Sequence, residues 1–164
     1  MKVVIFSTDR NILKYGSAAY KRQQAYAAYF DSYNVLVGSR HKHGLSAVDL
    51  GTDSRAMPLS VLGAVSAVRA ADVVSAQDPF ETGVVALLFA MIFRKPLHVQ
   101  VHTDLYGEGF VAEGFLNRIR RMAAAIVLRR AVRIRVVSEN IADGLKANGV
   151  IAPITVLPIF VDIK

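Results

Sequence analysis

Residues 72–106 read DVVSAQDPFETGVVALLFAMIFRKPLHVQVHTDLY, and this stretch decides the fold class. Residues 72–76 and 96–102 are short runs rich in valine, which favours strands. Between them, residues 80–94 form an apolar segment long enough for a buried helix. Two strands joined by a helix pair in parallel through a right-handed crossover. The stretch therefore predicts one strand–helix–strand unit of a parallel sheet.

The same alternation of strands and helices continues on both sides of this unit. Further strands are expected at residues 2–8, 34–39, 47–51, 134–138 and 154–157. Further helices are expected at residues 18–30, 58–70, 113–130 and 140–148. The pattern predicts an α/β fold with a doubly wound, mostly parallel Rossmann-like sheet and helices on both faces. We expect one domain over residues 1–164.

The composition excludes several classes of protein. Hydrophobic residues make up 53% of the chain, which is too apolar for intrinsic disorder. There is no cysteine, so disulfides, cysteine-ligated zinc and a thiol nucleophile are excluded. The apolar run at residues 1–6 is too short for a signal peptide, and residues 83–93 are too few to span a bilayer, so we expect a cytoplasmic protein.

Ligands in open parallel sheets bind at the carboxyl ends of the strands, so the first loop is a candidate site. It carries Asp9 and Arg10 as candidate cleft residues and places Gly16 and Ser17 at the start of a helix. The helix terminus suits a diphosphate, but the loop alone favours the simpler interpretation, a glycine turn with Ser17 as a helix cap. No G-x-G-x-x-G follows the first strand and no P-loop motif occurs, which argues against NAD-dependent dehydrogenases and P-loop NTPases.

Polar residues follow the later strands as well. Asp78 comes directly after residues 72–76, where it either faces a ligand or caps the next helix. His102 and Asp104 end the next strand, and an imidazole there suits proton exchange or hydrogen bonding to a polar substrate, or is a structural residue. Ser138 and Glu139 follow the strand after that. No clustered third ligand accompanies the histidines, so no metal site is expected.

The positive charge is concentrated in one segment. The net charge is +7, and residues 118–135 contain seven arginines and no acidic residue. On a helical wheel of residues 113–130 the large apolar residues share one side, which is expected to face the sheet. Arg118, Arg120 and Arg121 fall on the other side. They are expected to contact an anionic membrane, at about 1 kcal/mol per cation, or to form a solvated helix face.

Six strings resemble, in order and spacing, the amino-terminal domain of retaining family 4 glycosyltransferases with the two-domain GT-B architecture. They are FSTDRNILKYGSAAYKRQQAY (6–26), DVVSAQDPFETG (72–83), PLHVQVHTDLY (96–106), FLNRIRR (115–121), RIRVVSENI (133–141) and VLPIFVD (156–162). The resemblance implies an acceptor-side domain, with the nucleotide-sugar bound mainly by a carboxyl-terminal donor domain that these 164 residues lack.

Carried over by position, the resemblance assigns roles to several residues. Gly16 approaches the donor diphosphate, although many members have two glycines where this chain has Gly16 and Ser17. His102 meets the donor sugar and is the expected catalytic residue, and Ser138 with Glu139 forms a cleft-side pair.

The implied function is retaining transfer of a sugar from a nucleotide-sugar donor to a saccharide or lipid-linked acceptor. The isolated domain is expected to be inactive, with no metal or other cofactor and no nucleic-acid partner. The alternative is a non-catalytic α/β module that docks on an anionic membrane or an acidic partner through helix 113–130.

Overall fold

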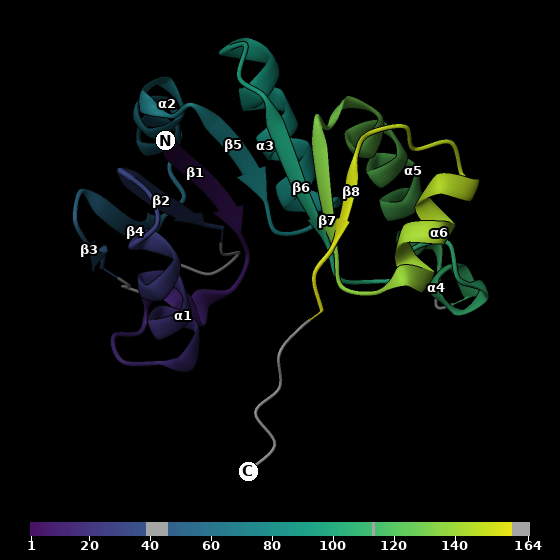
Figure 1. Cartoon of the computed structure of the whole chain (residues 1–164), viewed down its shortest axis with the longest axis horizontal. Helices are drawn as coiled ribbons and strands as arrows, with labels where there is room; N and C mark the ends of the chain where they lie inside the picture. Colours follow the sequence, from purple (N-terminus) through teal and green to yellow (C-terminus); the bar gives the residue numbers. More distant parts are fainter. Residues whose placement is uncertain (39–45, 113, 159–164) are drawn as a thin grey trace.

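The centre of the fold is a β-sheet whose strands are parallel except for one pair (Figure 1). The structure is a computed structural model, and it describes residues 1–38, 46–112 and 114–158. Within these ranges, eight strands follow the order β3-β4-β2-β1-β5-β6-β7-β8. The first strand therefore lies in the middle of the sheet, and the chain builds one side of the sheet before the other.

The observed strands are short, and one of them was not expected. They are β1 Lys2–Ser7, β2 Ser32–Val37, β3 Val48–Gly51, β4 Ser54–Pro58, β5 Val73–Ala76, β6 Leu97–Val101, β7 Arg133–Val136 and β8 Ile154–Val156. The sequence of β4 contains no β-branched residue and so carries no strand signal. It forms a strand because its backbone pairs in parallel with β2 and in antiparallel with β3.

The helices begin and end near the predicted positions. They are α1 Ala18–Ala27, α2 Val61–Ala70, α3 Glu81–Ile92, α4 Glu108–Ala112, α5 Phe115–Arg130 and α6 Glu139–Ala147, with a 3-10 helix at Arg10–Leu13. Ser17, Ser60 and Ser138 cap α1, α2 and α6 by accepting a hydrogen bond from the backbone N–H three residues later. The predicted helix 113–130 corresponds to α5, whereas α4 was not predicted, and residue 113 lies outside the described residues.

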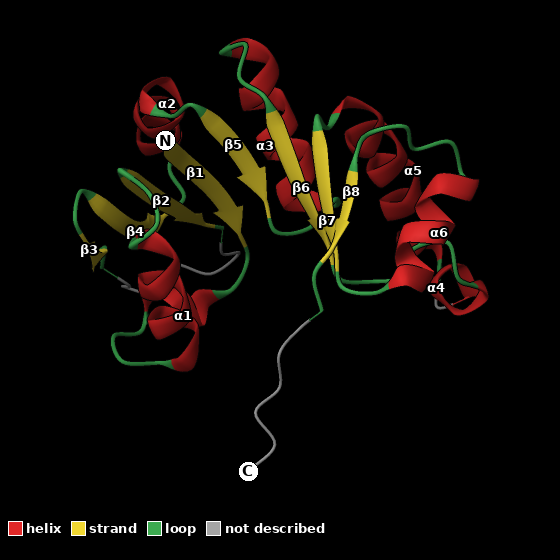
Figure 2. Cartoon of the chain, in the orientation of Figure 1, coloured by secondary structure: helices red, strands yellow, loops and turns green. Residues whose placement is uncertain are grey.

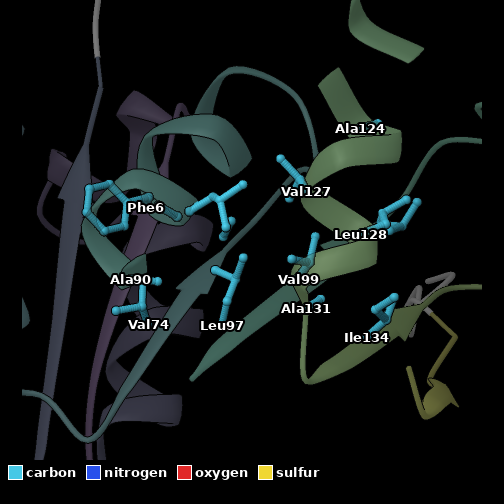
Figure 3. Packing of buried hydrophobic residues seen from close by; sticks show 14 of the residues in the cluster. Phe6, Val74, Ala90, Leu97, Val99, Ala124, Val127, Leu128, Ala131 and Ile134 are labelled. Atoms are coloured by element: carbon cyan, nitrogen blue, oxygen red, sulfur yellow. The ribbon is translucent and has the colours of Figure 1, made fainter. Parts of the chain in front are cut away.

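Helices cover both faces of the sheet, as the sequence predicted (Figure 2). Alternate residues of β1 point to opposite faces, with Val3 and Ile5 packing towards α1 and Val4 and Phe6 towards α2 and α3. In the core beside α3 and α5, side chains from β5, β6 and β7 pack against Ala90, Ala124, Val127 and Leu128 (Figure 3). The doubly wound α/β fold is therefore confirmed.

The orientation of α5 differs from the prediction. The buried residues are Ala124, Val127 and Leu128, whereas Phe115 is 75% exposed and Met122 is 70% exposed. Small residues let α5 lie close to α3, where a Cβ added to Gly83 would come within 3.2 Å of Val127 Cγ1. Of the large apolar side chains that were expected to face the sheet, Val127 is buried, and the exposed ones are Phe115, Leu116, Ile119, Met122 and Ile126.

Candidate functional site

A cavity of about 700 Å³ lies between the loops that follow β1 and β5, and we call it the switch-point cavity. At this point the order of the sheet reverses, because the chain moves from β1 to β2 on one side and later from β5 to β6 on the other. The carboxyl ends of β1 and β5 meet at the same edge (Figure 1). The polar lining residues are Ser7, Thr8, Arg10, Asp78, Glu81, Thr82 and Arg120.

Asp78 lies in the cavity and also fixes the start of α3. Its Oδ1 accepts a hydrogen bond from the Phe80 backbone N–H at 2.8 Å, and its Oδ2 accepts one from the Thr82 hydroxyl at 2.6 Å. Asp78 therefore lines the cavity and stabilises the turn before α3, while the N-cap position of α3 is Phe80, which has no side-chain cap hydrogen bond.

Arg120 belongs to this cavity and not to the exposed side of α5. Its Nη2 lies 2.6 Å from Glu81 Oε1, its Nε lies 3.0 Å from the same oxygen, and its guanidinium carbon lies 6.0 Å from the centre of the Phe80 ring. The expectation that Arg120 faces a membrane beside Arg118 and Arg121 is corrected by this ion pair. The pair closes one wall of the cavity against an aromatic ring.

Local hydrogen bonds fix the predicted site residues of the first loop. Asp9 caps the 3-10 helix by accepting from the Asn11 N–H at 3.0 Å, and Ser17 caps α1 by accepting from the Tyr20 N–H at 3.0 Å. Gly16 has a φ of +76°, which favours glycine, and a Cβ placed there would meet nothing within 4 Å. The space beside Gly16 is open to a ligand, while the Ser17 side chain is occupied as a cap.

His102 lies in a second cavity, which we call the open-face cavity. Its volume is about 560 Å³, and it is lined also by Arg22 of α1, Gln100 of β6 and Arg135 of β7. His102 has an exposed surface, but its pKa is lowered, first by partial burial and then by Arg135, while Asp78 acts in the opposite direction. The neutral imidazole is therefore favoured, and the structure does not place His102 in the lining of the switch-point cavity.

The remaining predicted cleft residues make contacts within their own loops. Asp104 accepts hydrogen bonds from the Gly107 N–H at 2.9 Å and from Asn140 Nδ2 at 3.1 Å, which ties the loop after β6 to α6. Ser138 caps α6, and Glu139 is its exposed first residue. None of these three lines either cavity. Across the described ranges, no group of three histidine or carboxylate side chains is arranged to hold a metal ion.

Several site residues were missed by the sequence analysis. Phe80, Glu81 and Arg120 line the switch-point cavity, but the Arg120–Glu81 pair joins residues 39 apart in the chain and leaves no local signal. Arg135 did have a signal, because Arg133 and Arg135 alternate with apolar residues on a strand that was expected to be buried. That alternation indicates a sheet face left open.

The fold and the switch-point cavity define a Rossmann-like α/β domain with a cavity at the carboxyl edge of its sheet. The family model described as glycosyl transferase 4-like domain matches residues 17–159. The chain therefore belongs to the glycosyl transferase 4-like domain family, and the resemblance found in the sequence is confirmed.

Solved structures show the same fold at low sequence identity. UDP-GlcNAc 2-epimerase from Methanocaldococcus jannaschii is similar with a TM-score of 0.56 and 14% identity over 95% of this chain. The match covers 45% of the epimerase chain, so the present chain spans less than half of its length. A comparison with curated protein sequences gives no significant match.

We expect the His102 imidazole to titrate below its ordinary pKa of 6.5, because the folded chain disfavours its charged form. The unfolded chain then binds the proton more readily, so this group reduces stability as the pH falls from 6.5 towards the lowered pKa. Arg135→Gln removes the second cause and should raise the pKa of His102. Histidine ring signals followed by NMR across a pH series measure both values.

Arg121→Gln is the control for this measurement, because Arg121 is exposed on α5 and does not line the open-face cavity. It should leave the pKa of His102 unchanged. A pKa at or above 6.5 in the unaltered chain, or equal values in the unaltered chain and Arg135→Gln, would contradict the assignment.

Proposed function

We propose that this chain is the acceptor-side half of a glycosyltransferase. The enzyme moves a sugar from a nucleotide-sugar to a saccharide or lipid-linked acceptor with retention of anomeric configuration. Membership of the glycosyl transferase 4-like domain family supports this reaction class. The proposed reaction uses the nucleotide-sugar as co-substrate and no metal.

The switch-point cavity is the observation that carries the proposal. Its volume of about 700 Å³ falls within the usual range for small-molecule sites, roughly 300–1,000 Å³. Phe80 offers an apolar surface, while Arg10, Thr8 and Asp78 offer hydrogen-bonding groups for sugar hydroxyls. Glu81 holds the Arg120 guanidinium in place at 2.6 Å, so this wall needs little rearrangement on binding.

We assign to the residues of this chain the positioning of the acceptor, because none of them stands out as a nucleophile for sugar transfer. Retaining transfer requires a stabilised leaving diphosphate, an acceptor hydroxyl held near the anomeric carbon, and exclusion of water. We assign the acceptor to the switch-point cavity and the donor mainly to a second domain. The open space at Gly16 suits an approaching diphosphate. The match to less than half of the epimerase supports a division into two halves.

We assign His102 to the donor sugar, because it lies at the carboxyl edge immediately after β6. Its lowered pKa keeps the ring neutral near pH 7, with one nitrogen as donor and the other as acceptor. A neutral imidazole can hydrogen-bond to a sugar hydroxyl without adding positive charge beside the departing sugar.

We expect the protein that carries both halves to transfer sugar from a nucleotide-sugar, and residues 1–164 alone to show no turnover. In the two-domain protein, His102→Ala should lower turnover by roughly 10- to 10⁴-fold, which is the range for losing one positioned hydrogen-bonding group. Product formation from a panel of nucleotide-sugars and acceptors, followed by mass spectrometry, measures the effect.

His98→Ala is the matched control, because His98 lies on the same strand and accepts or donates a 2.8 Å hydrogen bond with Ser75 away from the strand end. It should lower thermal stability and leave turnover of the folded protein nearly unchanged. Turnover by residues 1–164 alone would contradict the division into halves. Full activity of folded His102→Ala would contradict the assigned role.

The outward surface of α3 and α5 supports a second proposed property, which is binding to a membrane. We propose that the α3–α5 apolar surface docks the domain on an anionic membrane at the inner face of the cell. This surface consists of the exposed residues Val84, Leu88, Met91, Ile92, Phe115, Leu116, Ile119, Met122 and Ile126. Exposed apolar patches of this kind mark interaction sites on soluble proteins. Among the described residues, no helix has the length and apolar character required to cross a membrane.

The arrangement of α5 suits a helix that lies flat on a bilayer. Phe115, Ile119, Met122 and Ile126 recur every three or four residues on one side of the helix, opposite the buried Ala124. Arg118 and Arg121 are exposed on the same helix. Apolar side chains flanked by arginines combine insertion between lipids with attraction to anionic headgroups.

We expect the chain to co-sediment with vesicles that contain phosphatidylglycerol. Arg118→Ser with Arg121→Ser should remove about 1 kcal/mol of attraction per residue, and less at high salt because the charges are screened. Ile119→Ser with Met122→Ser should weaken binding at every salt concentration, because apolar contact is not screened. Vesicle co-sedimentation across a salt series distinguishes these two effects.

Tyr15→Ser with Tyr29→Ser is the control, because both tyrosines are more than 80% exposed and neither belongs to the α3–α5 apolar surface. This double variant should bind vesicles like the unaltered chain. Absence of vesicle binding would contradict the proposal, as would equal binding by all the variants. A stable dimer without vesicle binding would assign the surface to contact between copies.

A further inference from the structure

The open-face cavity results from the topology of the sheet. The helices that follow β5, β6 and β7 all pack on the face opposite α1, and α1 itself covers only β1 to β4. On the α1 side, no helix in the described ranges therefore covers β6 and β7. Their alternate residues on this side are polar, with Gln100 on β6 and Arg135 on β7.

The arginines of this cavity are not paired with a carboxylate among its described lining residues. Arg22 and Arg135 line it, and no aspartate or glutamate is among its lining residues. Neither arginine forms an ion pair with a carboxylate in the described part of the chain. Two positive charges therefore face a space of about 560 Å³ that, among the described residues, no carboxylate lines.

The Arg135 guanidinium is held in place, but its hydrogen bonds are long and one of its donors has no described partner. Its Nη1 lies 3.3 Å from Gln100 Oε1 and its Nη2 lies 3.4 Å from the Leu157 carbonyl oxygen, both long for hydrogen bonds to a guanidinium. Its Nε is buried and has no hydrogen-bond partner within the described ranges. A buried donor without a partner is destabilising, so the hydrogen-bonding capacity of the Arg135 guanidinium is not filled by the described residues.

Further donors surround the same space from other elements. Gln77 follows β5, and its Oε1 accepts a hydrogen bond from the Ser7 hydroxyl at 2.5 Å, which leaves its amide NH₂ group as the donor. His102 follows β6. With Arg22 and Arg135, the donors come from four segments. A phosphoryl group has three terminal oxygens to accept from such a set, whereas a carboxylate has two oxygens in one plane.

We propose that the open-face cavity binds the phosphoryl group of a small phosphorylated molecule, with Arg22 and Arg135 as its charged contacts. This site is separate from the switch-point cavity and from the Gly16 loop. The site shares His102 with the proposed donor-sugar contact, but its charged contacts, Arg22 and Arg135, do not line the switch-point cavity, so phosphate binding is tested separately from sugar transfer. The lowered pKa of His102, caused by burial and by Arg135 and Arg22, agrees with an excess of positive charge.

Titration of the chain with inorganic phosphate at constant ionic strength tests this site. By NMR, the His102 ring signals and the Arg135 Nε–H signal should shift and saturate together. Arg135→Gln and Arg22→Gln should each raise the Kd for phosphate by about tenfold or more, which is the effect of losing a charge-assisted hydrogen bond. Arg133→Gln is the control on the same strand and should leave the Kd unchanged, because Arg133 does not line this cavity.

Arg22 is exposed on α1, so Arg22→Gln should fold normally and decides the result if Arg135→Gln unfolds. Shifts that do not saturate would overturn the proposal. An equal loss of affinity in Arg133→Gln would overturn it as well, because it would indicate attraction to net charge alone. Acetate that binds as tightly as phosphate would overturn the assignment to a phosphoryl group.

Discussion

The right-handed crossover is the constraint on which the rest of this structure depends. Because each strand–helix–strand connection turns the same way, the direction of travel across the sheet decides which face a helix covers. The chain moves from β1 to β2 first, which places α1 on one face, and later from β5 to β8, which places α3, α5 and α6 on the other. The reversal separates the loops after β1 and β5, and the switch-point cavity lies between them.

The same constraint accounts for the two other surfaces to which we assign ligands. On the α1 side, none of the helices that the structure describes covers β6 and β7, so polar residues occupy positions that would otherwise be apolar. On the opposite side, α3 and α5 pack through small residues such as Gly83 and Ala124, so their large apolar side chains remain outside. Arginines lie beside both surfaces. The positive charge that the sequence concentrates in one segment is thus divided among an ion pair, a cavity and an exposed helix side.

Local patterns predicted most of the fold and part of the candidate site. Valine-rich runs identified the central strands, and the position of Asp78 and Arg10 after strands placed both in the switch-point cavity. The failures have a physical cause in long-range packing. Pairing with neighbours makes β4 a strand, and close helix contact turns the alanine side of α5 inwards. The Arg120–Glu81 pair depends on that rotation, so no local pattern could reveal it.

The central claim is that the switch-point cavity receives the saccharide acceptor. A crystal of the chain soaked with a panel of mono- and disaccharides tests it most directly. The account predicts saccharide density between the loop after β1 and the start of α3, beside Phe80 and within hydrogen-bonding distance of Arg10 or Asp78. Saccharide bound only on the outer helices or in the open-face cavity would contradict the account, as would an empty switch-point cavity at saturating saccharide.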